Sequence, residues 1–440
     1  MLNSPNQVLR QQSAFRAPWN IFWTALLVRV LYMTLAHTYR FPPVEDHFKF
    51  GFEMARIARS MVMGHGFANP FMRPTGVPSA WNPPLYPLAI AAAFKVFGVY
   101  TLKSAWALLA LNSVFSAATV PAIYEIAARC YARTGKGRSI ALWSAWLWAL
   151  YPAAMQYAVR WVWDMSLTTM LLTWALVMAL RLAGIGSEEE RRRTTLYWAL
   201  FGLLWGLIAL SNSTLLLFLP VCGIWILIRA ENKAAAIRGA VLAGVVCIAC
   251  ITPWMWRNWR VFHAVVPLRG NFGAELWMGN APFANGFAWG ITVTSVKDLQ
   301  HYSAVGEVEY VREHGAMAKA YIRQRPADFA ALSLKRFFMF WASVPHAMDN
   351  KPWAEDFREV NYCFLSLTGL MGLALSLRNR VPSAGMLAWV FVLYPLTYYF
   401  VVVSARFRHP LEPLITIFTV YLFQSAQPRK PRAPAALASS

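Results

Sequence analysis

Three acidic residues follow closely on the first long apolar segment and could act as a catalytic base. They are Glu45, Asp46 and Glu53, in the sequence "FPPVEDHFKFGFEMARIARS". A carboxylate that is partly shielded from water can remove a proton from a hydroxyl group. The spacing of Glu53 and Arg56 also places them on one face of a short amphipathic helix, where they could form a solvated ion pair instead. Spacing alone leaves both interpretations of Glu53 open.

Asp164 is the next candidate, in "YAVRWVWDMSLTTMLL" at the start of an apolar segment over residues 164–182. A charge at the edge of a membrane-buried segment is costly, and such residues usually face a cavity or a charged partner. The alternative is a local ion pair with Arg160, combined with the favourable position of an acid at a helix N-terminus. Both interpretations stay open.

Arginines stand at the ends of two other apolar segments. Arg257 and Arg260 follow one segment in "ITPWMWRNWRVFHAVVP", and Arg406 and Arg408 precede the last one in "SARFRHPLEP". A guanidinium presents a planar fork of donors that matches phosphate oxygens, and it keeps its charge in almost any environment. These arginines could bind the phosphate of a substrate, or they could make general contacts with lipid headgroups.

The composition indicates what kind of scaffold must position these residues. Of the 440 residues, 58% are hydrophobic and 14% are charged, and the mean hydropathy is +0.40. Soluble domains are less apolar and about 25% charged, and disordered chains are poorer still in apolar residues. The formal net charge is +21, but no soluble basic domain is visible that could bind nucleic acid. A polytopic membrane protein is the remaining class.

Long apolar segments recur along the chain and predict an all-α membrane fold. A transmembrane helix needs roughly 20 apolar residues, so we predict a bundle of about ten such helices (roughly 9–12). The candidate segments are residues 19–39, 104–131, 139–157, 164–182, 195–211, 214–229, 239–256, 358–377, 384–403 and 411–425. Two further segments, 84–100 and 327–345, fit helices that lie along the membrane surface better than spans.

Basic residues determine the expected orientation of these helices. Lys and Arg are enriched in cytoplasmic loops, and placing the N-terminus inside puts "RTGKGR", "SEEERRRTT", "RAENKAAAIR" and "PRKPR" in the cytoplasm. We therefore expect a multi-pass protein of the plasma (inner) membrane. The predicted parts are a cytoplasmic N-tail 1–18, a transmembrane core 19–256 that includes the first external loop 40–103, an external region 257–357, C-terminal transmembrane helices 358–426 and a disordered cytoplasmic tail 427–440.

The cytoplasmic loops are too short to hold a nucleotide-binding domain. Such a domain carries a Gly-rich phosphate-binding turn, and the chain contains neither GxGxxG nor GxxxxGK[ST]. Chemistry is therefore expected on the extracytoplasmic side, where the candidate carboxylates and arginines lie. No cofactor is predicted with certainty. A divalent metal held by Glu53 or Asp46 with a distant histidine stays open, although no histidines stand at a recognisable ligand spacing such as HExxH.

In their order along the chain, these features resemble the GT-C glycosyltransferases, specifically the family-39-like group related to protein O-mannosyltransferases and the lipid A aminoarabinose transferase. The resemblance rests on an acidic first external loop, then "ARIARSMVMGHGF" and "WNPPLYPLAIAAAFKVFG", then "TPWMWRNWRVF" with "GNFGAELWMGN", and finally "ARFRHPLEP" before the last span. It covers most of the chain and implies a GT-C-like helical bundle with external interfacial helices.

The resemblance implies an integral-membrane glycosyltransferase that transfers a hexosyl or pentosyl group with inversion. The donor would be a polyprenyl-phosphate sugar, and the acceptor an extracytoplasmic protein, lipid A or wall glycan. A lipid-linked donor agrees with the lack of room for a cytoplasmic donor domain. The alternative is a transporter or flippase for lipid-linked or amphipathic substrates, although the sequence lacks the evident internal repeat that is typical of transporters.

The resemblance also suggests roles for the acidic residues. Related enzymes carry an acidic pair before the "A-R" helix, but here the pair Glu45–Asp46 stands several residues farther upstream, and Glu53 lies nearer the helix. The general base is therefore expected to be Asp46 or Glu53, with Glu45 third. Asp164 matches the acidic residue that opens the fourth span and is expected to line the same cavity.

The arginines would meet the donor phosphate. The four candidates are Arg257, Arg406, Arg408 and Arg160. In the implied single displacement, a first-loop carboxylate takes the acceptor proton while the hydroxyl attacks the anomeric carbon. The phosphate then leaves, with its charge met by arginine side chains or a divalent ion.

Overall fold

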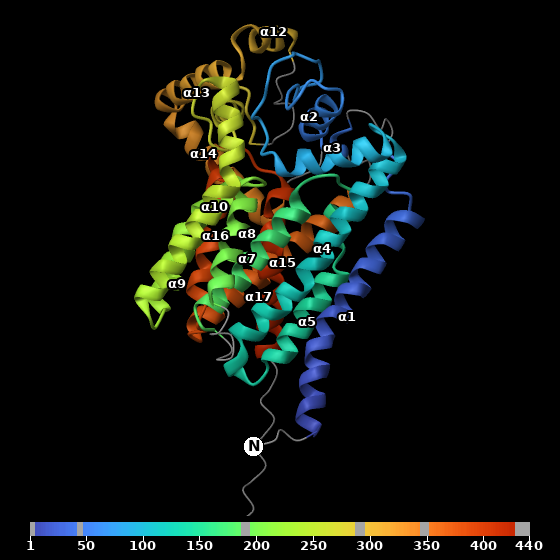
Figure 1. The fold of residues 1–440 in the computed structure, drawn as a ribbon, viewed down its shortest axis with the longest axis vertical. Coiled ribbons are helices and arrows are strands. Elements are labelled where there is room, and N and C mark those ends of the chain that lie inside the picture. Colours follow the sequence, from blue (N-terminus) through green and yellow to red (C-terminus); the bar gives the residue numbers. More distant parts are fainter. Residues whose placement is uncertain (1–4, 42–46, 186–193, 287–294, 344–351, 427–440) are drawn as a thin grey trace, which may run out of the picture.

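The fold consists of a long helical bundle with a cap of shorter helices over one end (Figure 1). The computed structural model describes residues 5–41, 47–185, 194–286, 295–343 and 352–426. Within these ranges the regular structure is helical, and the β pairing found there is one isolated bridge between Ala68 and Pro78. The predicted all-α fold is therefore confirmed. The predicted disordered tail 427–440 lies outside the described residues.

The bundle draws its helices from both halves of the chain. They are α1 (Pro5–Leu35), α4 (Leu102–Cys130), α5 (Gly137–Leu150), α6 (Pro152–Val159), α7 (Met165–Leu182), α8 (Thr194–Ala209), α9 (Leu219–Arg229), α10 (Lys233–Phe262), α15 (Pro352–Arg378), α16 (Ala384–Phe400) and α17 (Glu412–Ser425), with the 3-10 helices η2 (Ala132–Thr134), η4 (Ser213–Phe218) and η5 (Ala405–Leu411) between them. The α1 helix begins at the end of the bundle opposite the cap (Figure 1).

The cap is built from the two regions that were expected to be external. Its elements are η1 (Phe48–Phe50), α2 (Glu53–Val62), α3 (Leu85–Phe97), α11 (Phe272–Asn280), α12 (Val296–Val305), α13 (Glu307–Gln324) and α14 (Pro326–Ala342). The segments 84–100 and 327–345, predicted as short surface helices, correspond to α3 and α14. The α3 helix runs across the cap end of the bundle (Figure 1).

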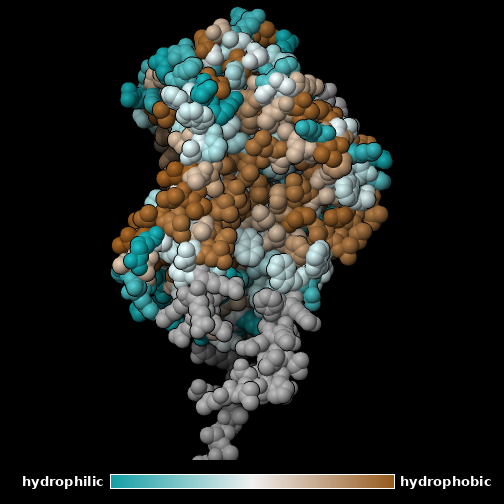
Figure 2. All heavy atoms as spheres, viewed as in Figure 1, coloured by the Kyte–Doolittle hydropathy of each residue, from teal (hydrophilic) through white to brown (hydrophobic). Residues whose placement is uncertain are grey.

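Apolar side chains cover the middle of the bundle. Figure 2 shows a hydrophobic band on this face, with hydrophilic side chains gathered on the cap and at the opposite end. Four helices of the described chain are long and apolar enough to cross a membrane: Leu102–Cys130, Met165–Leu182, Lys233–Phe262 and Asp356–Arg378. These features support a membrane protein. The count of about ten spans stays a prediction, because several bundle helices are shorter.

Close packing between bundle helices depends on glycine. A Cβ atom on Gly202 of α8 would lie 2.2 Å from the carbonyl oxygen of Ala243 on α10. A Cβ atom on Gly372 of α15 would lie 2.0 Å from the carbonyl oxygen of Phe418 on α17. Small residues allow backbones to approach in this way, which is a common mode of helix association in membranes.

One predicted span, over residues 139–157, is divided into the two helices α5 and α6. Pro152 begins α6 and has no N–H group, so the carbonyl oxygen of Trp148 loses its helical partner. An unsatisfied carbonyl in an apolar environment is costly and needs another donor.

The buried side chain of Arg29 supplies that donor. Its Nη2 donates to the carbonyl oxygen of Trp148 at 3.1 Å, and its Nη1 donates to that of Ala149 at 2.8 Å. Its Nε donates to Ser116 Oγ at 3.1 Å, and the residue is 0% exposed. The Arg29 side chain on α1 therefore satisfies the carbonyl oxygens of Trp148 and Ala149 at the break between α5 and α6.

Candidate active site

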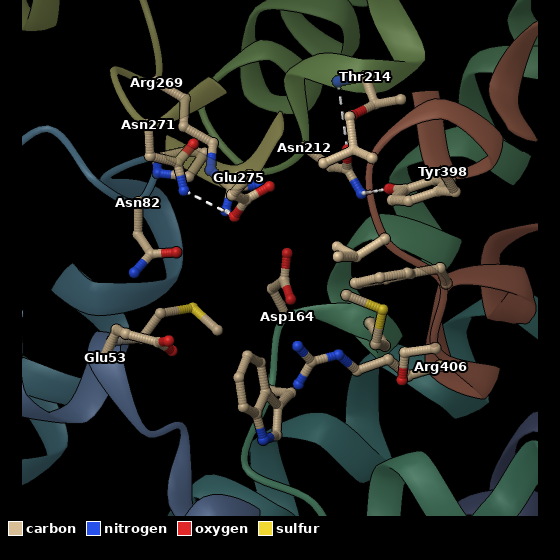
Figure 3. A pocket seen from close by; sticks show the side chains of 18 of the residues that line it. Glu53, Asn82, Asp164, Asn212, Thr214, Arg269, Asn271, Glu275, Tyr398 and Arg406 are labelled. Atoms are coloured by element: carbon tan, nitrogen blue, oxygen red, sulfur yellow. Dashed lines mark hydrogen bonds and ion pairs between the residues drawn. The ribbon is translucent and has the colours of Figure 1, made fainter. Parts of the chain in front are cut away.

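A cavity of about 260 Å³, lined by apolar and charged side chains, lies between the cap and the bundle. Its lining comes from segments far apart in the sequence: residues 48–54, 81–83, 161–165, 211–214, 269–278 and 397–407 all contribute. Figure 3 shows the side chains that point into it. Three of the predicted site residues, Glu53, Asp164 and Arg406, line this one cavity.

The region that was expected to form the first external loop is joined by hydrogen bonds to the connection between α6 and α7. The backbone N–H of Val162 donates to the carbonyl oxygen of Lys49 at 2.8 Å. The indole Nε1 of Trp163 donates to the carbonyl oxygen of Phe48 at 2.8 Å. These two bonds bring the start of α2 beside the start of α7, so that a carboxylate from each helix start reaches the cavity.

Glu53 is the first residue of α2. The chain turns sharply before it, with φ values of 76° at Gly51 and 43° at Phe52, and this turn directs the helix start towards the cavity. Burial raises the pKa of the Glu53 carboxyl group, while the positive charges of Arg56 and Arg406 act in the opposite direction. A raised pKa makes a carboxylate a stronger base towards a hydroxyl group.

Asp164 immediately precedes α7 and points towards the middle of the cavity (Figure 3). Its side chain is buried, and burial raises its pKa to about 6, against the opposing effects of Arg406 and Arg269. The alternative of a local pair with Arg160 finds no support, because the Arg160 guanidinium contacts Tyr32, with Nη2 2.5 Å from the hydroxyl oxygen. Asp164 therefore faces the cavity, which agrees with the interpretation that its charge is directed towards a cavity and not towards Arg160.

Arg406 enters the cavity from η5, opposite Glu53 (Figure 3). Its guanidinium carbon lies 3.6 Å from the centre of the Trp163 ring. Two of its nitrogens, Nε and Nη1, are buried and find no hydrogen-bond partner within the described parts of the chain. Buried donors of this kind are rare and costly, so the arrangement is suited to a bound anion.

The other three candidate arginines do not reach this cavity. Arg408 is buried in an ion pair with Glu412, with 2.7 Å between Nε and Oε1. Arg257 donates to the carbonyl oxygens of Ser79 and Phe67 at 2.7 and 2.8 Å. Together with Arg160, which contacts Tyr32 as described above, they bind protein groups and do not line the cavity.

A further carboxylate in the cavity was missed in the sequence. Glu275, on α11, accepts from Arg269 Nη2 at 2.5 Å and from Asn271 Nδ2 at 2.7 Å, both at Oε1 (Figure 3). The segment "GNFGAELWMGN" that carries it is rich in glycine, asparagine and aromatic residues. That composition suits turns over a polar cavity, but it does not single out Glu275 as a site residue.

Asn82 was also missed. It follows Trp81 in "WNPPLYP" and lines the same cavity as Glu53 (Figure 3). A run of two prolines after an asparagine predicts an extended loop, but nothing in that pattern shows what the asparagine side chain faces.

Buried Glu307 holds this part of the first loop in place. It accepts from Ser79 Oγ at 2.6 Å, from the backbone N–H of Ala80 at 2.5 Å and from the Tyr302 hydroxyl at 2.9 Å. Burial raises its pKa, and these three donors oppose the shift. We call Glu307, Ser79, Ala80 and Tyr302 the cap latch, because they join the first external loop to the second external region.

Within the residues that are described, no three His, Cys, Asp or Glu side chains come together in a group that could hold an ion. Two of the predicted base candidates, Glu45 and Asp46, lie outside the described residues. The prediction of a divalent metal therefore stays open.

Sequence-level comparisons find no relatives: no family model matches the chain, and no curated protein matches it. Comparison with solved structures does find similar folds. The apo oligosaccharyltransferase of Archaeoglobus fulgidus matches 93% of this chain with a TM-score of 0.52 and 12% identity. The same enzyme, tethered with an acceptor peptide containing the NVT sequon, matches 92% with a TM-score of 0.50 and 10% identity.

This chain covers only about half of that oligosaccharyltransferase, 50% and 49% of its length in the two structures. ArnT from Cupriavidus metallidurans, bound to undecaprenyl phosphate, is also found, with 13% identity, a TM-score of 0.39, and coverage of 91% of this chain and 77% of that one. At these identities the likeness concerns the fold. The chain has a fold similar to that of the Archaeoglobus fulgidus oligosaccharyltransferase, which agrees with the fold that the resemblance in the sequence implied.

Proposed function

We propose that this protein is an integral-membrane glycosyltransferase that moves a sugar from a polyprenyl-phosphate donor to an extracytoplasmic acceptor, with inversion. One observation carries the proposal: two carboxylates, Glu53 and Asp164, share a cavity with the buried, partly unsatisfied guanidinium of Arg406. A base and a phosphate-binding cation in one enclosed space are the groups that this transfer needs.

Arg406 binds the donor phosphate in this proposal. Stacking on Trp163 fixes the plane of the guanidinium, so that its free N–H groups form a prepared site for phosphate oxygens. When the bond from the anomeric carbon to the phosphate oxygen breaks, negative charge grows on the leaving phosphate. A fixed cation at that point stabilises the transition state more than the ground state.

Glu53 acts as the general base. In an inverting displacement the acceptor hydroxyl attacks from the side opposite the leaving phosphate, so the base must lie across the cavity from the phosphate site. Glu53 lies across the cavity from Arg406, with Asp164 between them (Figure 3). Asp164 is placed to orient the acceptor or the sugar. Asp46 and Glu45 remain candidates that the described residues leave untested.

The position of the cap supports an extracytoplasmic site. The cap lies at the end of the bundle away from the start of α1 (Figure 1). The turn between α4 and α5 lies at that other end (Figure 1), and the sequence around this turn contains Arg133, Lys136 and Arg138. By the positive-inside rule this end faces the cytoplasm and the cap faces outwards. We propose a plasma-membrane protein with about ten spans.

The fold comparison suggests which class of acceptor to test first. The fold is similar to that of an oligosaccharyltransferase, and one structure of that enzyme carries a tethered acceptor peptide. A protein acceptor is therefore the first to test, followed by lipid A and wall glycans.

A transfer assay tests the proposal. The purified protein is incubated with radiolabelled polyprenyl-phosphate sugars and each acceptor class, beside Glu53→Gln and Arg406→Gln. Glu309→Gln serves as the matched control, because Glu309 lies in an exposed pair with Arg312 on the cap. We expect label in an acceptor product with wild type and control only. Movement of intact donor across proteoliposomes without bond cleavage would replace the proposal with a transporter.

A further inference from the structure

We propose that Arg408 is a positioning residue, which sets the place of the Arg406 side chain in the cavity without contacting the substrate itself. The proposal rests on the proposed function, in which Arg406 binds the donor phosphate. It gives a role in donor use to a buried arginine that binds protein groups and does not line the cavity.

The guanidinium of Arg406 is held mainly by its own backbone and by one close aromatic ring. Its Nε and Nη1 find no hydrogen-bond partner among the described residues, and its guanidinium carbon lies 3.6 Å from the centre of the Trp163 ring. Stacking on a ring fixes the plane of a guanidinium, but it leaves open how far the side chain reaches into the cavity. That reach depends on where the backbone of η5 lies.

The element that carries Arg406 needs support from its neighbours. The η5 helix (Ala405–Leu411) is a 3-10 helix of seven residues. The hydrogen bonds of a 3-10 helix have poor geometry, so runs longer than roughly three or four residues are uncommon. Because the helix has three residues per turn, Arg406 and Arg408 also project from different sides of it. Arg408 can therefore hold the helix in the protein while Arg406 faces the cavity.

Contacts with α15 fix the backbone on both sides of Arg406. Before it, the Tyr362 hydroxyl donates to the carbonyl oxygen of Ala405 at 3.1 Å. After it, Arg408 Nη1 donates to the carbonyl oxygen of Tyr362 at 3.1 Å and to Ser366 Oγ. The Arg408 guanidinium carbon also lies 3.2 Å from the centre of the Tyr362 ring. A single residue of α15 thus holds the chain before and after the phosphate-binding arginine.

The same guanidinium joins η5 to the second external region. Arg408 Nη1 lies 3.3 Å from the carbonyl oxygen of Trp341, in the last turn of α14. Ser366 Oγ donates to the same oxygen at 2.5 Å. The end of α14 is thereby attached to the helix that carries Arg406, so a displacement at this junction would move Arg406 as well.

The ion pair of Arg408 with Glu412 is better explained by positioning than by stability. Both residues are buried, with exposed fractions of 0% and 5%. A buried ion pair seldom adds net stability, because the cost of removing two charges from water offsets their attraction. Glu412 compensates the charge of Arg408, so Arg408 affects the cavity through geometry more than through its charge.

A double-mutant cycle tests whether Arg408 acts through Arg406. Arg408→Lys keeps a charge opposite Glu412 but loses the planar fork, and it is made both in wild type and in Arg406→Gln. Two quantities are measured: kcat/KM for a polyprenyl-phosphate sugar, and the affinity for radiolabelled polyprenyl phosphate without a sugar. In wild type we expect Arg408→Lys to lower each by about 10-fold, as a misplaced binding group would. In Arg406→Gln we expect less than about 2-fold further loss.

Arg29→Lys is the matched control, because Arg29 is another fully buried arginine that donates to backbone carbonyl oxygens. It should leave both quantities unchanged per folded molecule in either background. If Arg408→Lys does not fold, Tyr362→Phe takes its place in the cycle. That variant removes the hydroxyl that binds Ala405 and should lower donor affinity only where Arg406 is present.

The possible outcomes separate this proposal from the proposed function. An equal loss in both backgrounds, or no loss in wild type, would overturn the positioning role of Arg408 and leave the proposed function standing. Binding of polyprenyl phosphate without any sugar transfer would overturn the proposed function, and the binding cycle would still decide the role of Arg408. No binding of polyprenyl phosphate by wild type would overturn both.

Discussion

The guanidinium of Arg406 stacks on the indole of Trp163 at 3.6 Å, and Trp163 in turn donates to the backbone of Phe48 in the first external loop. A single aromatic side chain thus connects the cation from η5 with the loop that carries Glu53. The phosphate-binding group and the base of the proposed reaction are positioned by the same contact. The predictions below follow from that arrangement and from the residues that support it.

Replacing Arg406 should weaken donor use most strongly. Arg406→Gln removes the charge, and we expect a fall in kcat/KM of about 100-fold, comparable to the loss of one transition-state donor. Arg406→Lys keeps the charge but loses the planar fork, so it should recover only part of the rate. Initial rates at varied donor concentration measure both, with Arg312→Gln as an exposed control. Equal rates in wild type and Arg406→Gln would remove Arg406 from the site.

Activity should depend on pH through Asp164. Burial raises its pKa to about 6, so the proton that is ordinarily lost near pH 4 is lost near pH 6 here. If the ionised form is needed, kcat/KM is constant at neutral pH and falls as the pH drops through about 6. Burial also raises the pKa of Glu53, so protonation of Glu53 should likewise lower kcat/KM as the pH falls. A pH profile measures this, and a flat profile between about pH 5 and 8 would contradict it.

Disrupting the cap latch should loosen the cap and weaken donor binding together. Glu307→Ala leaves three donors without an acceptor, and we expect a loss of about 1–3 kcal/mol in stability. We also expect a higher donor KM, because the latch holds the segment whose next residues, 81–83, line the cavity. Glu307→Gln keeps an acceptor for the N–H of Ala80 and should lose less. Thermal unfolding and donor KM are the measurements. An unchanged Tm in Glu307→Ala would show that the latch adds nothing.

Replacing Arg29 should lower the stability of the protein without changing its catalytic activity. Arg29→Met leaves the carbonyl oxygens of Trp148 and Ala149 without a donor in the bundle, and the expected loss is about 1.5–3 kcal/mol. Unfolding in detergent measures it, and activity per folded molecule should stay at the wild-type value. Loss of turnover without loss of Tm would instead connect Arg29 with the reaction.

Much of the fold could be predicted because apolar runs of the right length determine where bundle helices form. The distribution of charge predicted an external position for residues 40–103 and 257–357, and the structure brings helices from both regions together in one cap. The break between α5 and α6 is visible as Pro152 in the sequence. The sequence does not show that Arg29 donates to the carbonyl oxygens at this break, because Arg29 lies on another helix, far along the chain from Trp148 and Ala149.

The site could be predicted only in part, because residues that are far apart in the sequence come together only in the folded chain. Asp164 and Arg406 stand at the ends of apolar segments, where a charged side chain needs a cavity or a partner, and Glu53 begins a short amphipathic helix. Arg257 and Arg408 satisfy the same pattern, but they find their partners in the protein itself. Glu275 and Asn82 carry no local signal, since tertiary packing alone brings them to the cavity.

The central claim is that Glu53 takes the acceptor proton opposite a phosphate held by Arg406. The most direct measurement is the initial rate of sugar transfer from a polyprenyl-phosphate donor by Glu53→Gln, beside Glu309→Gln and wild type, for protein that is equally folded. The account predicts a fall of at least about 100-fold in kcat for Glu53→Gln, with donor KM little changed and the control unaffected. Full turnover by Glu53→Gln would contradict it.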